Sequence, residues 1–157
     1  MNRKILIVGG VAGGASAAAR VRRLDAHAKI IMFERGQHVS FSNCCLPYHL
    51  SGTVENSDSL VLMTPERFAK QYDIEARVQS EVTAIYPKEK KVAVRDRQSG
   101  DTYEESYDKL ILAPGANPIM PKSITGIDKK HVFSVRNVTD IKALKQYIDL
   151  NGITKAA

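Results

Sequence analysis

The only two cysteines of this 157-residue chain stand side by side, within Ser40-Phe41-Ser42-Asn43-Cys44-Cys45-Leu46-Pro47-Tyr48. We interpret Cys44 as a reactive thiol, because Asn43 is a good helix N-cap and Pro47 suits a first helical turn. A thiol at the positive start of a short helix is favoured as its nucleophilic thiolate. The alternative is that both cysteines are small apolar residues in a loop. An adjacent pair provides no long-range disulfide framework, which favours a reducing, cytoplasmic setting.

A glycine-rich turn is the second candidate site. Residues 4–8 form a continuous apolar run, typical of a parallel strand buried on both faces, and an alanine-rich helix is predicted over 15–24. The turn between them, residues 9–14, resembles G-x-G-x-x-G with Val11 in the middle glycine's place. Such turns bind a pyrophosphate through backbone N–H groups and the helix N-terminus. The next apolar run ends at Glu34, 20 residues after Gly14, which suits a ribose-binding carboxylate.

The rest of the chain predicts the elements that would position these sites. Thr64 followed by Pro65 predicts the start of a short helix ending near Tyr72. Alternating apolar residues over 75–107 predict antiparallel hairpin strands. A buried parallel strand is expected at 109–113, followed by a second glycine turn, and an amphipathic helix is expected over 135–148. The predicted fold is therefore α/β, a Rossmann-like doubly wound parallel sheet with an inserted antiparallel β-meander.

Composition narrows the function classes. A chain that is 43% hydrophobic and 25% charged is ordinary for one globular domain. The net charge of +6 suits small anionic ligands, but the basic residues are dispersed among acidic ones, so nucleic acid is not an expected partner. No run approaches the roughly 18 apolar residues that a membrane span needs. The four histidines lack metal-ligand spacing with the cysteines, so no metal site is predicted.

The cysteine segment resembles the active-site motif of coenzyme A disulfide reductases, single-cysteine members of the FAD-dependent pyridine nucleotide-disulfide oxidoreductases. The glycine turn, Arg22-Arg23-Leu24-Asp25 and Tyr107-Asp108-Lys109-Leu110-Ile111-Leu112-Ala113-Pro114-Gly115-Ala116 extend the resemblance over nearly the whole chain. It implies that residues 1–157 are an FAD-binding domain and a fragment of a longer chain. The NAD(P)H-binding and dimerisation domains of such an enzyme would lie beyond Ala157, and the full-length protein would be a homodimer.

The resemblance also assigns roles around the cofactor. The dinucleotide would be FAD, with its ribose at Glu34 and its isoalloxazine ring beside Cys44. Cys44 would attack the substrate disulfide and hold half of it as a mixed disulfide until reducing equivalents from NAD(P)H release it. The other positions implied to lie along FAD are Gly9, Ala12, Gly13, Gly14, Pro114 and Gly115.

A third set of residues is implied to hold the substrate. Ser16, Arg20 and Arg23 are spaced i, i+4, i+7 and so share one helix face. By resemblance this face, with Ser40 and Asn43, contacts the coenzyme A moiety, and guanidinium groups suit its phosphates. The alternative is a solvated helix face, which is common for exposed arginines.

Two residues depart from the family pattern, and several functions stay open. Arg20 stands where a neutral polar residue is usual, and Cys45 stands where the family has a small glycine or alanine. We expect Cys45 to be a filler, rather than a protector of Cys44 or its partner in a vicinal disulfide. The alternative functions are an NAD(P)H oxidase or peroxidase that uses a cysteine sulfenic acid, a polysulfide or persulfide reductase, and a flavin- or coenzyme A-binding module without turnover. The fragment alone is expected to be inactive.

Overall fold

The computed structural model describes residues 2–155, and these residues form two compact units. The first unit contains the chain up to Phe41 together with Val61–Gly115. The second contains Ser42–Leu60 and the residues from Ala116 onward. The glycine-rich turn thus belongs to the first unit and the adjacent cysteines belong to the second. The prediction that residues 1–157 are one FAD-binding domain stays a prediction.

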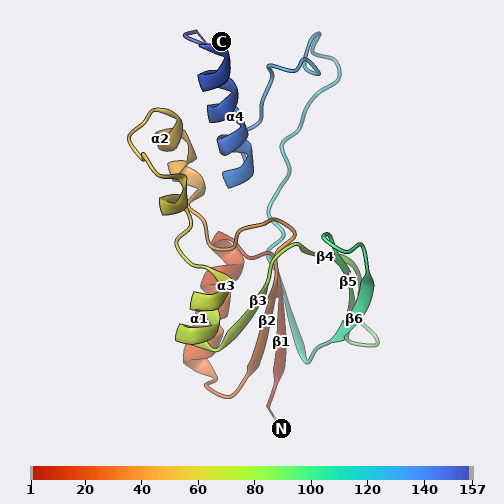
Figure 1. Ribbon diagram of the computed structural model, residues 1–157. Helices are drawn as coiled ribbons and strands as arrows, with labels where there is room; N and C mark the ends of the chain where they lie inside the picture. Colours follow the sequence, from red (N-terminus) through yellow and green to blue (C-terminus); the bar gives the residue numbers. More distant parts are fainter. Residues whose placement is uncertain (1, 156–157) are drawn as a thin grey trace. The chain divides into compact units, whose positions relative to one another are not determined.

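A four-stranded parallel sheet forms the centre of the first unit, in the order β3-β2-β1-β7 (Figure 1). Its strands are β1 (Lys4–Val8), β2 (Lys29–Phe33), β3 (Ile74–Arg77) and β7 (Lys109–Leu112). The register pairs Leu6 of β1 with Ile31 on one side and with Leu110 on the other. The two apolar runs that predicted central strands are confirmed, and they place the glycine-rich turn at the carboxyl end of β1.

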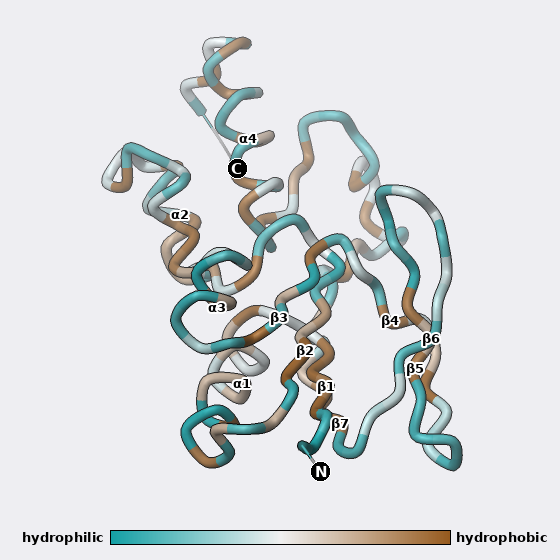
Figure 2. Tube along the Cα trace, turned by 60° about the horizontal axis from the view of Figure 1, so that its bottom comes forward, coloured by the Kyte–Doolittle hydropathy of each residue, from teal (hydrophilic) through white to brown (hydrophobic). Residues whose placement is uncertain are grey.

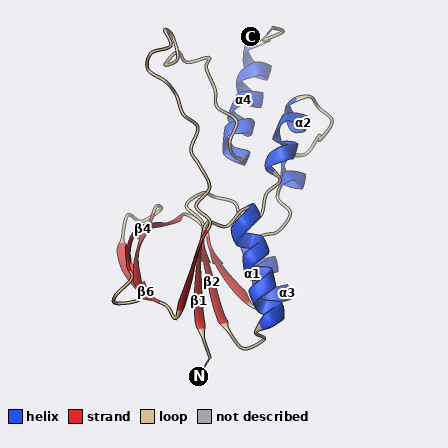
Figure 3. Ribbon diagram, turned by 180° about the vertical axis from the view of Figure 1, so that it is seen from behind, coloured by secondary structure: helices blue, strands red, loops and turns tan. Residues whose placement is uncertain are grey.

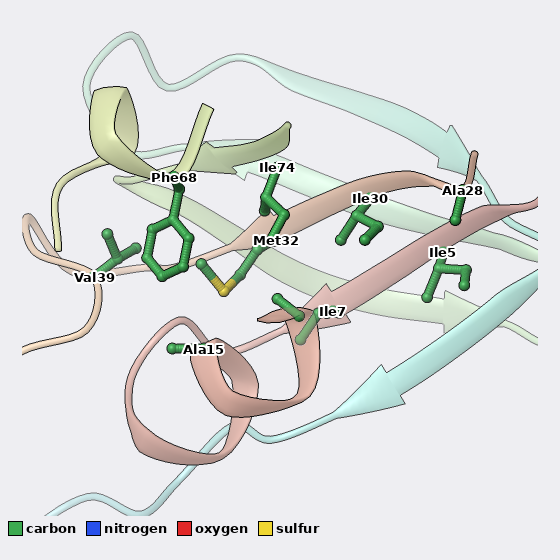
Figure 4. Close-up of a cluster of buried hydrophobic side chains, with 10 residues drawn as sticks. Ile5, Ile7, Ala15, Ala28, Ile30, Met32, Val39, Phe68 and Ile74 are labelled. Carbon is green, nitrogen blue, oxygen red and sulfur yellow. The ribbon is translucent and has the colours of Figure 1, made fainter. Parts of the chain in front are cut away.

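Helices α1 (Ala12–Leu24) and α3 (Pro65–Tyr72) cover one face of this sheet (Figure 3). Alternate strand residues point toward them, since side chains along a strand alternate between faces. Figure 4 shows Ile7 and Met32 in one cluster of buried side chains with Ala15 of α1 and Phe68 of α3. The small alanines on the buried side of α1 allow the helix to approach the strands closely. This packing holds the start of α1 against the end of β1.

The other face of the sheet is covered by an antiparallel meander. Its strands are β4 (Ser80–Tyr86), β5 (Lys91–Asp96) and β6 (Thr102–Ser106), in the order β4-β5-β6. Leu6 and Phe33 point to this side and pack with Val92 and Val94. With both faces covered, β1 and β2 are apolar after their first residue, a lysine in each, and are brown in Figure 2. The predicted Rossmann-like doubly wound parallel sheet with an inserted meander is confirmed.

Two strands differ from the sequence expectation. The stretch from Glu75 was predicted to begin the hairpin strands, but Ile74–Arg77 pairs in parallel with β2. Its polar residues alternate with apolar ones because it is an edge strand, and an edge strand has the same pattern as a hairpin strand. The strand β7 was predicted to be buried, yet Leu112 is 56% exposed, because β7 forms the opposite edge of the described sheet.

The second unit is built from short helices. They are the 3-10 helices η1 (Asn43–Cys45) and η2 (Ser57–Leu60) and the α-helices α2 (Leu46–Leu50) and α4 (Val138–Asn151). Leu46, Leu60, Val138 and Ile141 are its buried apolar side chains. Helix α4 was predicted from residue 135, but it begins at 138 because Asn137 and Asp140 form a capping box. Within residues 2–155, no helix is long and apolar enough to cross a membrane.

Candidate functional site

Gly9 directly follows β1 and has a backbone conformation that favours glycine. Its φ is +96°, and its N–H donates to the Phe33 carbonyl at 2.8 Å. A Cβ at this position would lie 1.9 Å from the carbonyl oxygen of Ala113, where the chain leaves β7. A side chain therefore cannot fit without moving backbone atoms. Through these contacts with Phe33 and Ala113, the carboxyl ends of β1, β2 and β7 lie close together.

Gly14 is required for a different reason. It lies in the first turn of α1, where an added Cβ would meet the carbonyl oxygen of Gly9 at 1.7 Å. Its neighbour Gly13 is far less restricted, since a Cβ there would make an ordinary contact with Ala113 at 3.4 Å. Gly10, which the sequence analysis did not assign to the cofactor, is also crowded, because a Cβ there would lie 2.9 Å from Cβ of Glu34.

The first turn of α1 presents backbone donors. Val11 is the N-cap residue and makes no side-chain hydrogen bond to the helix. The first N–H groups of a helix have no carbonyl partner within the helix, and an aliphatic cap leaves them available. Ala12 and Gly13 are exposed here, so their backbone can be approached from outside. A helix of this length with uncapped N–H groups fits a pyrophosphate.

Glu34 follows β2 and its carboxylate is held by two backbone groups. Oε2 accepts a hydrogen bond from the N–H of Gly10 at 2.8 Å, and Oε1 accepts one from the N–H of Gly36 at 2.8 Å. The carboxylate therefore links the glycine-rich turn to the turn that follows β2. Each carboxylate oxygen can still accept a second hydrogen bond. The predicted contact between Glu34 and a ribose stays a prediction.

A cleft opens beside this turn within the first unit. The residues that line it are Val8, Gly9, Phe33, Glu34, Arg35, Ser80, Glu81, Val82 and Pro114. It lies at the carboxyl ends of the central strands, where ligands bind in open α/β sheets. Pro114 was predicted to lie along the cofactor and does line this cleft, while Gly115 follows it with a φ of +67°. The β4 residues were missed because nothing in their composition marks them.

The predicted substrate face of α1 is exposed. Ser16, Arg20 and Arg23 are all exposed, on the side of α1 opposite Gly14, Ala15 and Ala18, which are buried. Arg22 behaves differently, because its guanidinium donates to the carbonyls of Tyr72 at 2.8 Å and Asp73 at 2.7 Å. It ties the end of α1 to the end of α3 and is structural.

Ser40 lies next to the glycine-rich turn in the same unit. Its N–H donates to the carbonyl of Gly10 at 2.8 Å, and its own carbonyl accepts from Leu62 at 2.9 Å. Its φ of +47° is unusual for a residue other than glycine. The hydrogen bond to Gly10 and the one from Leu62 hold it in this conformation. Asn43, the other predicted polar contact, is exposed in the second unit.

Cys44 lies in η1 with its side chain exposed. The hydroxyl of Ser42 lies 3.3 Å from its Sγ. Hydrogen bonds from Ser42, from Cys45 and from the backbone lower the pKa of the Cys44 thiol, although burial slightly opposes this. The lowered pKa moves the thiol toward its thiolate form, and its largest cause is a neighbouring hydroxyl; the predicted role of Cys44 as the reactive thiol stays a prediction.

The predicted capping role of Asn43 is wrong. Asn43 is the first residue of η1, and Ser42 occupies the cap position with extended backbone. Cys45 donates its N–H to the Ser42 carbonyl at 3.2 Å, which closes the first turn one residue earlier than expected. His49 is buried and its Nδ1 lies 2.7 Å from the Val54 carbonyl, so it donates there and packs the segment. Among the described residues, no group of three or more potential ligands is placed to hold a metal ion.

A parallel sheet with a glycine-rich turn, a following helix and an acidic residue after the second strand defines the FAD/NAD(P)-binding class of Rossmann-type folds. Residues 3–151 match the model of the pyridine nucleotide-disulphide oxidoreductases, and the chain belongs to this family of oxidoreductases.

Three similar proteins sharpen the comparison. A coenzyme A disulfide reductase of Staphylococcus haemolyticus is 41% identical over 154 residues, which are 98% of this chain and 34% of the relative. The crystal structure of reduced CoADR-RHD of Bacillus anthracis is 47% identical, with a TM-score of 0.92 over 97% of this chain and 27% of that one. An NAD-dependent persulfide reductase of A. fulgidus is 30% identical, with a TM-score of 0.88 over 94% of this chain and 27% of that one. The chain thus spans about a third of its curated relatives' length.

Proposed function

We propose that this chain serves the FAD-dependent, NAD(P)H-driven reduction of coenzyme A disulfide, or of related small disulfides and persulfides, through Cys44. The observation that carries the proposal is the exposed Cys44 thiol, hydrogen-bonded to Ser42, in a chain 41% identical to a coenzyme A disulfide reductase. The persulfide reductase among the similar structures supports the wider substrate class. A single exposed thiol is the minimum that such chemistry requires.

FAD is the proposed dinucleotide, and the first unit fits it. The uncapped start of α1 offers N–H groups for the pyrophosphate, which would lie against the turn of Gly9, Ala12, Gly13 and Gly14, where Ala12 and Gly13 are exposed. Glu34 would bind the adenosine ribose, and Pro114 and Gly115 would lie along the same cofactor; Glu34 and Pro114 both line the cleft. When bound, FAD takes two electrons from NAD(P)H and delivers them to a disulfide.

The thiol chemistry follows from the state of Cys44. Its thiolate attacks one sulfur of the substrate RS–SR, forms the mixed disulfide Cys44–S–S–R, and expels RS⁻, which takes up a proton. Two electrons that originate from NAD(P)H then cleave the mixed disulfide, so Cys44 is restored as a thiolate and the second RSH leaves. Overall, RS–SR, NAD(P)H and one proton become two RSH and NAD(P)⁺.

Substrate binding is proposed on the exposed face of α1. Arg20 and Arg23 carry guanidinium groups that suit phosphate oxygens, and no ion pair holds either of them within residues 2–155. Ser16, Ser40 and Asn43 would add neutral hydrogen bonds. A coenzyme A disulfide carries several phosphate groups, and this distinguishes it from small uncharged disulfides. The positive face therefore favours the coenzyme A type.

We also propose that residues 1–157 are the FAD-binding part of a longer, homodimeric cytoplasmic enzyme. The NAD(P)H site would lie in another part of it. Support comes from the share of the relatives that the chain spans and from the two free thiols, which a reducing compartment preserves.

A mass measurement tests the thiol step without cofactor. The chain is incubated with coenzyme A disulfide, and intact mass and peptide mapping report a coenzyme A adduct. We expect one adduct at Cys44 in the parent chain and in Cys45→Ala, and none at this position in Cys44→Ser. An adduct that survives Cys44→Ser would assign the chemistry to Cys45 instead.

Visible absorbance of bound flavin and turnover test the rest. After FAD is added and the excess removed, the expected flavin band confirms the dinucleotide, and Gly14→Ala should abolish it. The full-length protein should then oxidise NAD(P)H in proportion to coenzyme A thiol released. Oxygen consumption without added disulfide would instead favour the oxidase alternative.

A further inference from the structure

Arg77 is the last residue of β3 and lies beside residues that line the cleft. In the parallel register it pairs with Phe33, the last residue of β2. Its carbonyl accepts a hydrogen bond from the N–H of Glu34 at 2.9 Å. Phe33 and Glu34 both line the cleft, whereas Arg77 does not. Any effect of Arg77 on a ligand in the cleft must therefore pass through these two neighbours.

Three polar groups hold the guanidinium of Arg77. Its Nε donates to Glu75 at 2.7 Å, and its Nη1 donates to Glu105 at 2.8 Å and to the Tyr103 hydroxyl at 3.1 Å. A guanidinium is planar and its N–H donors point in fixed directions, so these contacts fix both its position and its plane. Glu105 and Tyr103 belong to β6. The side chain thus joins the parallel sheet to the meander.

The same guanidinium lies over two aromatic rings. Its central carbon is 5.4 Å from the ring centroid of Phe33 and 5.7 Å from that of Tyr103. A cation within about 6 Å of a ring centroid is attracted to the face of the ring. Phe33 is buried, and its carbonyl accepts from the N–H of Gly9 at 2.8 Å. Arg77 therefore restrains a residue that lines the cleft and whose backbone holds the start of the glycine-rich turn.

The geometry points to Arg77 as a positioning residue for the dinucleotide, because it holds Phe33 and the backbone of Glu34 in place. The identity of the ligand rests on the proposed function, but the restraint on the two residues does not. A lysine at this position would keep the positive charge. An ammonium lacks the planar fork of a guanidinium, so it cannot bind all three polar groups and also lie over both rings. Charge alone is therefore not sufficient for this role.

Amide hydrogen exchange followed by NMR tests the restraint on the cofactor-free 157-residue chain. We expect Arg77→Lys to speed exchange of the Gly9 and Glu34 N–H groups by about tenfold or more, while amides of α1 and α3 change little. Arg22→Lys is the matched control, because Arg22 also fixes backbone carbonyls in this unit but does not line the cleft. It should speed exchange at Asp73, which follows α3, and leave the amides of Gly9 and Glu34 unchanged.

Titration with FAD, followed by flavin fluorescence, tests the consequence for binding. With each variant shown to be folded by circular dichroism, Arg77→Lys should raise the Kd for FAD about five- to thirtyfold. This range is typical of substitutions that change a site without touching its ligand. Arg22→Lys should lower the resistance to urea and leave the Kd unchanged, because a purely structural loss does not alter the affinity of the folded chain.

Two results would overturn the proposal, since Arg77 would then only stabilise the fold. One is exchange in Arg77→Lys that is faster by the same factor throughout the sheet, and the other is an unchanged Kd for FAD. If Arg77→Lys proved unfolded, Tyr103→Phe removes one group that holds the guanidinium and supplies a milder form of the same comparison. If the parent chain bound no FAD, the dinucleotide proposal would fail, and exchange at Gly9 and Glu34 would still decide whether Arg77 positions them.

Discussion

The glycine-rich turn and the cysteine segment are fixed in different ways. In the turn, backbone atoms approach so closely that Gly9 and Gly14 leave no space for a Cβ, and Glu34 binds two N–H groups. In the cysteine segment Cys44 is exposed, and its state depends on a few polar contacts, chiefly that of Ser42. The turn is thus determined by sterics, while the thiol is adjusted by one hydroxyl. Substitutions should be costly in the first region and mild in the second.

The largest effect is expected from Gly14→Ala. The new Cβ would lie 1.7 Å from the Gly9 carbonyl oxygen, so α1 or β1 must move. We expect a loss of about 3 kcal/mol or more in the free energy of unfolding, measured by urea denaturation. The matched control is Gly13→Ala, one residue earlier in the same helix, where the Cβ contact of 3.4 Å is ordinary. It should be neutral or stabilise by up to about 1 kcal/mol.

Equal unfolding free energies for the two alanine variants would contradict this account. The turn would then have to be pliable, and the contrast with the cysteine segment would disappear.

Glu34→Ala should have the second largest effect. It removes both acceptors of the Gly10 and Gly36 N–H groups, and we expect a loss of about 1 to 3 kcal/mol in the absence of any dinucleotide. A carboxylate that served only to bind ribose would leave the stability of the cofactor-free chain unchanged. Urea unfolding before and after FAD addition separates the two roles. Glu55→Ala, in the second unit, is the control for loss of one negative charge.

The glycine-rich turn was predictable from the sequence. For Glu34, the position after β2 was predictable but the hydrogen bonds of its carboxylate were not. The apolar runs of β1 and β2 are buried on both faces, so their pattern needed no knowledge of partners. Likewise Thr64 before Pro65 predicted the start of α3, which the Thr64 hydroxyl caps by accepting from Arg67. Glu34 was placed correctly after β2, but its bonds to Gly10 and Gly36 depend on backbone directions that composition does not encode.

Elements defined by pairing were harder to predict. Ile74–Arg77 reads as a hairpin strand until its parallel partner β2 is known. Ser80 and Val82 line the cleft only because β4 crosses beside Phe33, more than 40 residues away in the sequence. The role of Ser42 was missed for a similar reason, since Asn43 is an equally good cap and one residue decides which begins η1.

The third prediction concerns an ion-pair cluster of the first unit. Burial opposes ionisation of Glu105, but hydrogen bonds from Lys4 and Arg77 outweigh it and lower the pKa of this carboxyl. Because the folded pKa is lowered, the stabilisation is fully present above the unfolded value of about 4.3 and is lost as pH falls through the folded value. We expect Glu105→Gln to cost about 1 to 2 kcal/mol at neutral pH and less near pH 3.

The neighbouring Glu104 supplies the control for this cluster. Its ion pair with Lys91 is exposed, so Glu104→Gln should change the unfolding free energy by less than about 0.5 kcal/mol at either pH. Urea midpoints measured at both pH values for both variants show whether the charge of Glu105 stabilises the fold. A Glu105→Gln effect that did not shrink in acid would mean that packing, and not charge, holds the meander to the sheet.

The smallest effect is expected in the cysteine segment, from Ser42→Ala. Removing the hydroxyl raises the pKa of the Cys44 thiol, because the largest stabilising hydrogen bond of its thiolate is lost. Alkylation of Cys44 by iodoacetamide, followed by peptide mass spectrometry, should slow by less than about tenfold at neutral pH. It should not slow above about pH 10, where the thiol is ionised in both proteins. Ser51→Ala is the matched control, because that hydroxyl bonds Tyr48 and Thr53 instead. An equal slowing in Ser51→Ala would mean that the whole segment, rather than one contact, sets the reactivity of the thiol.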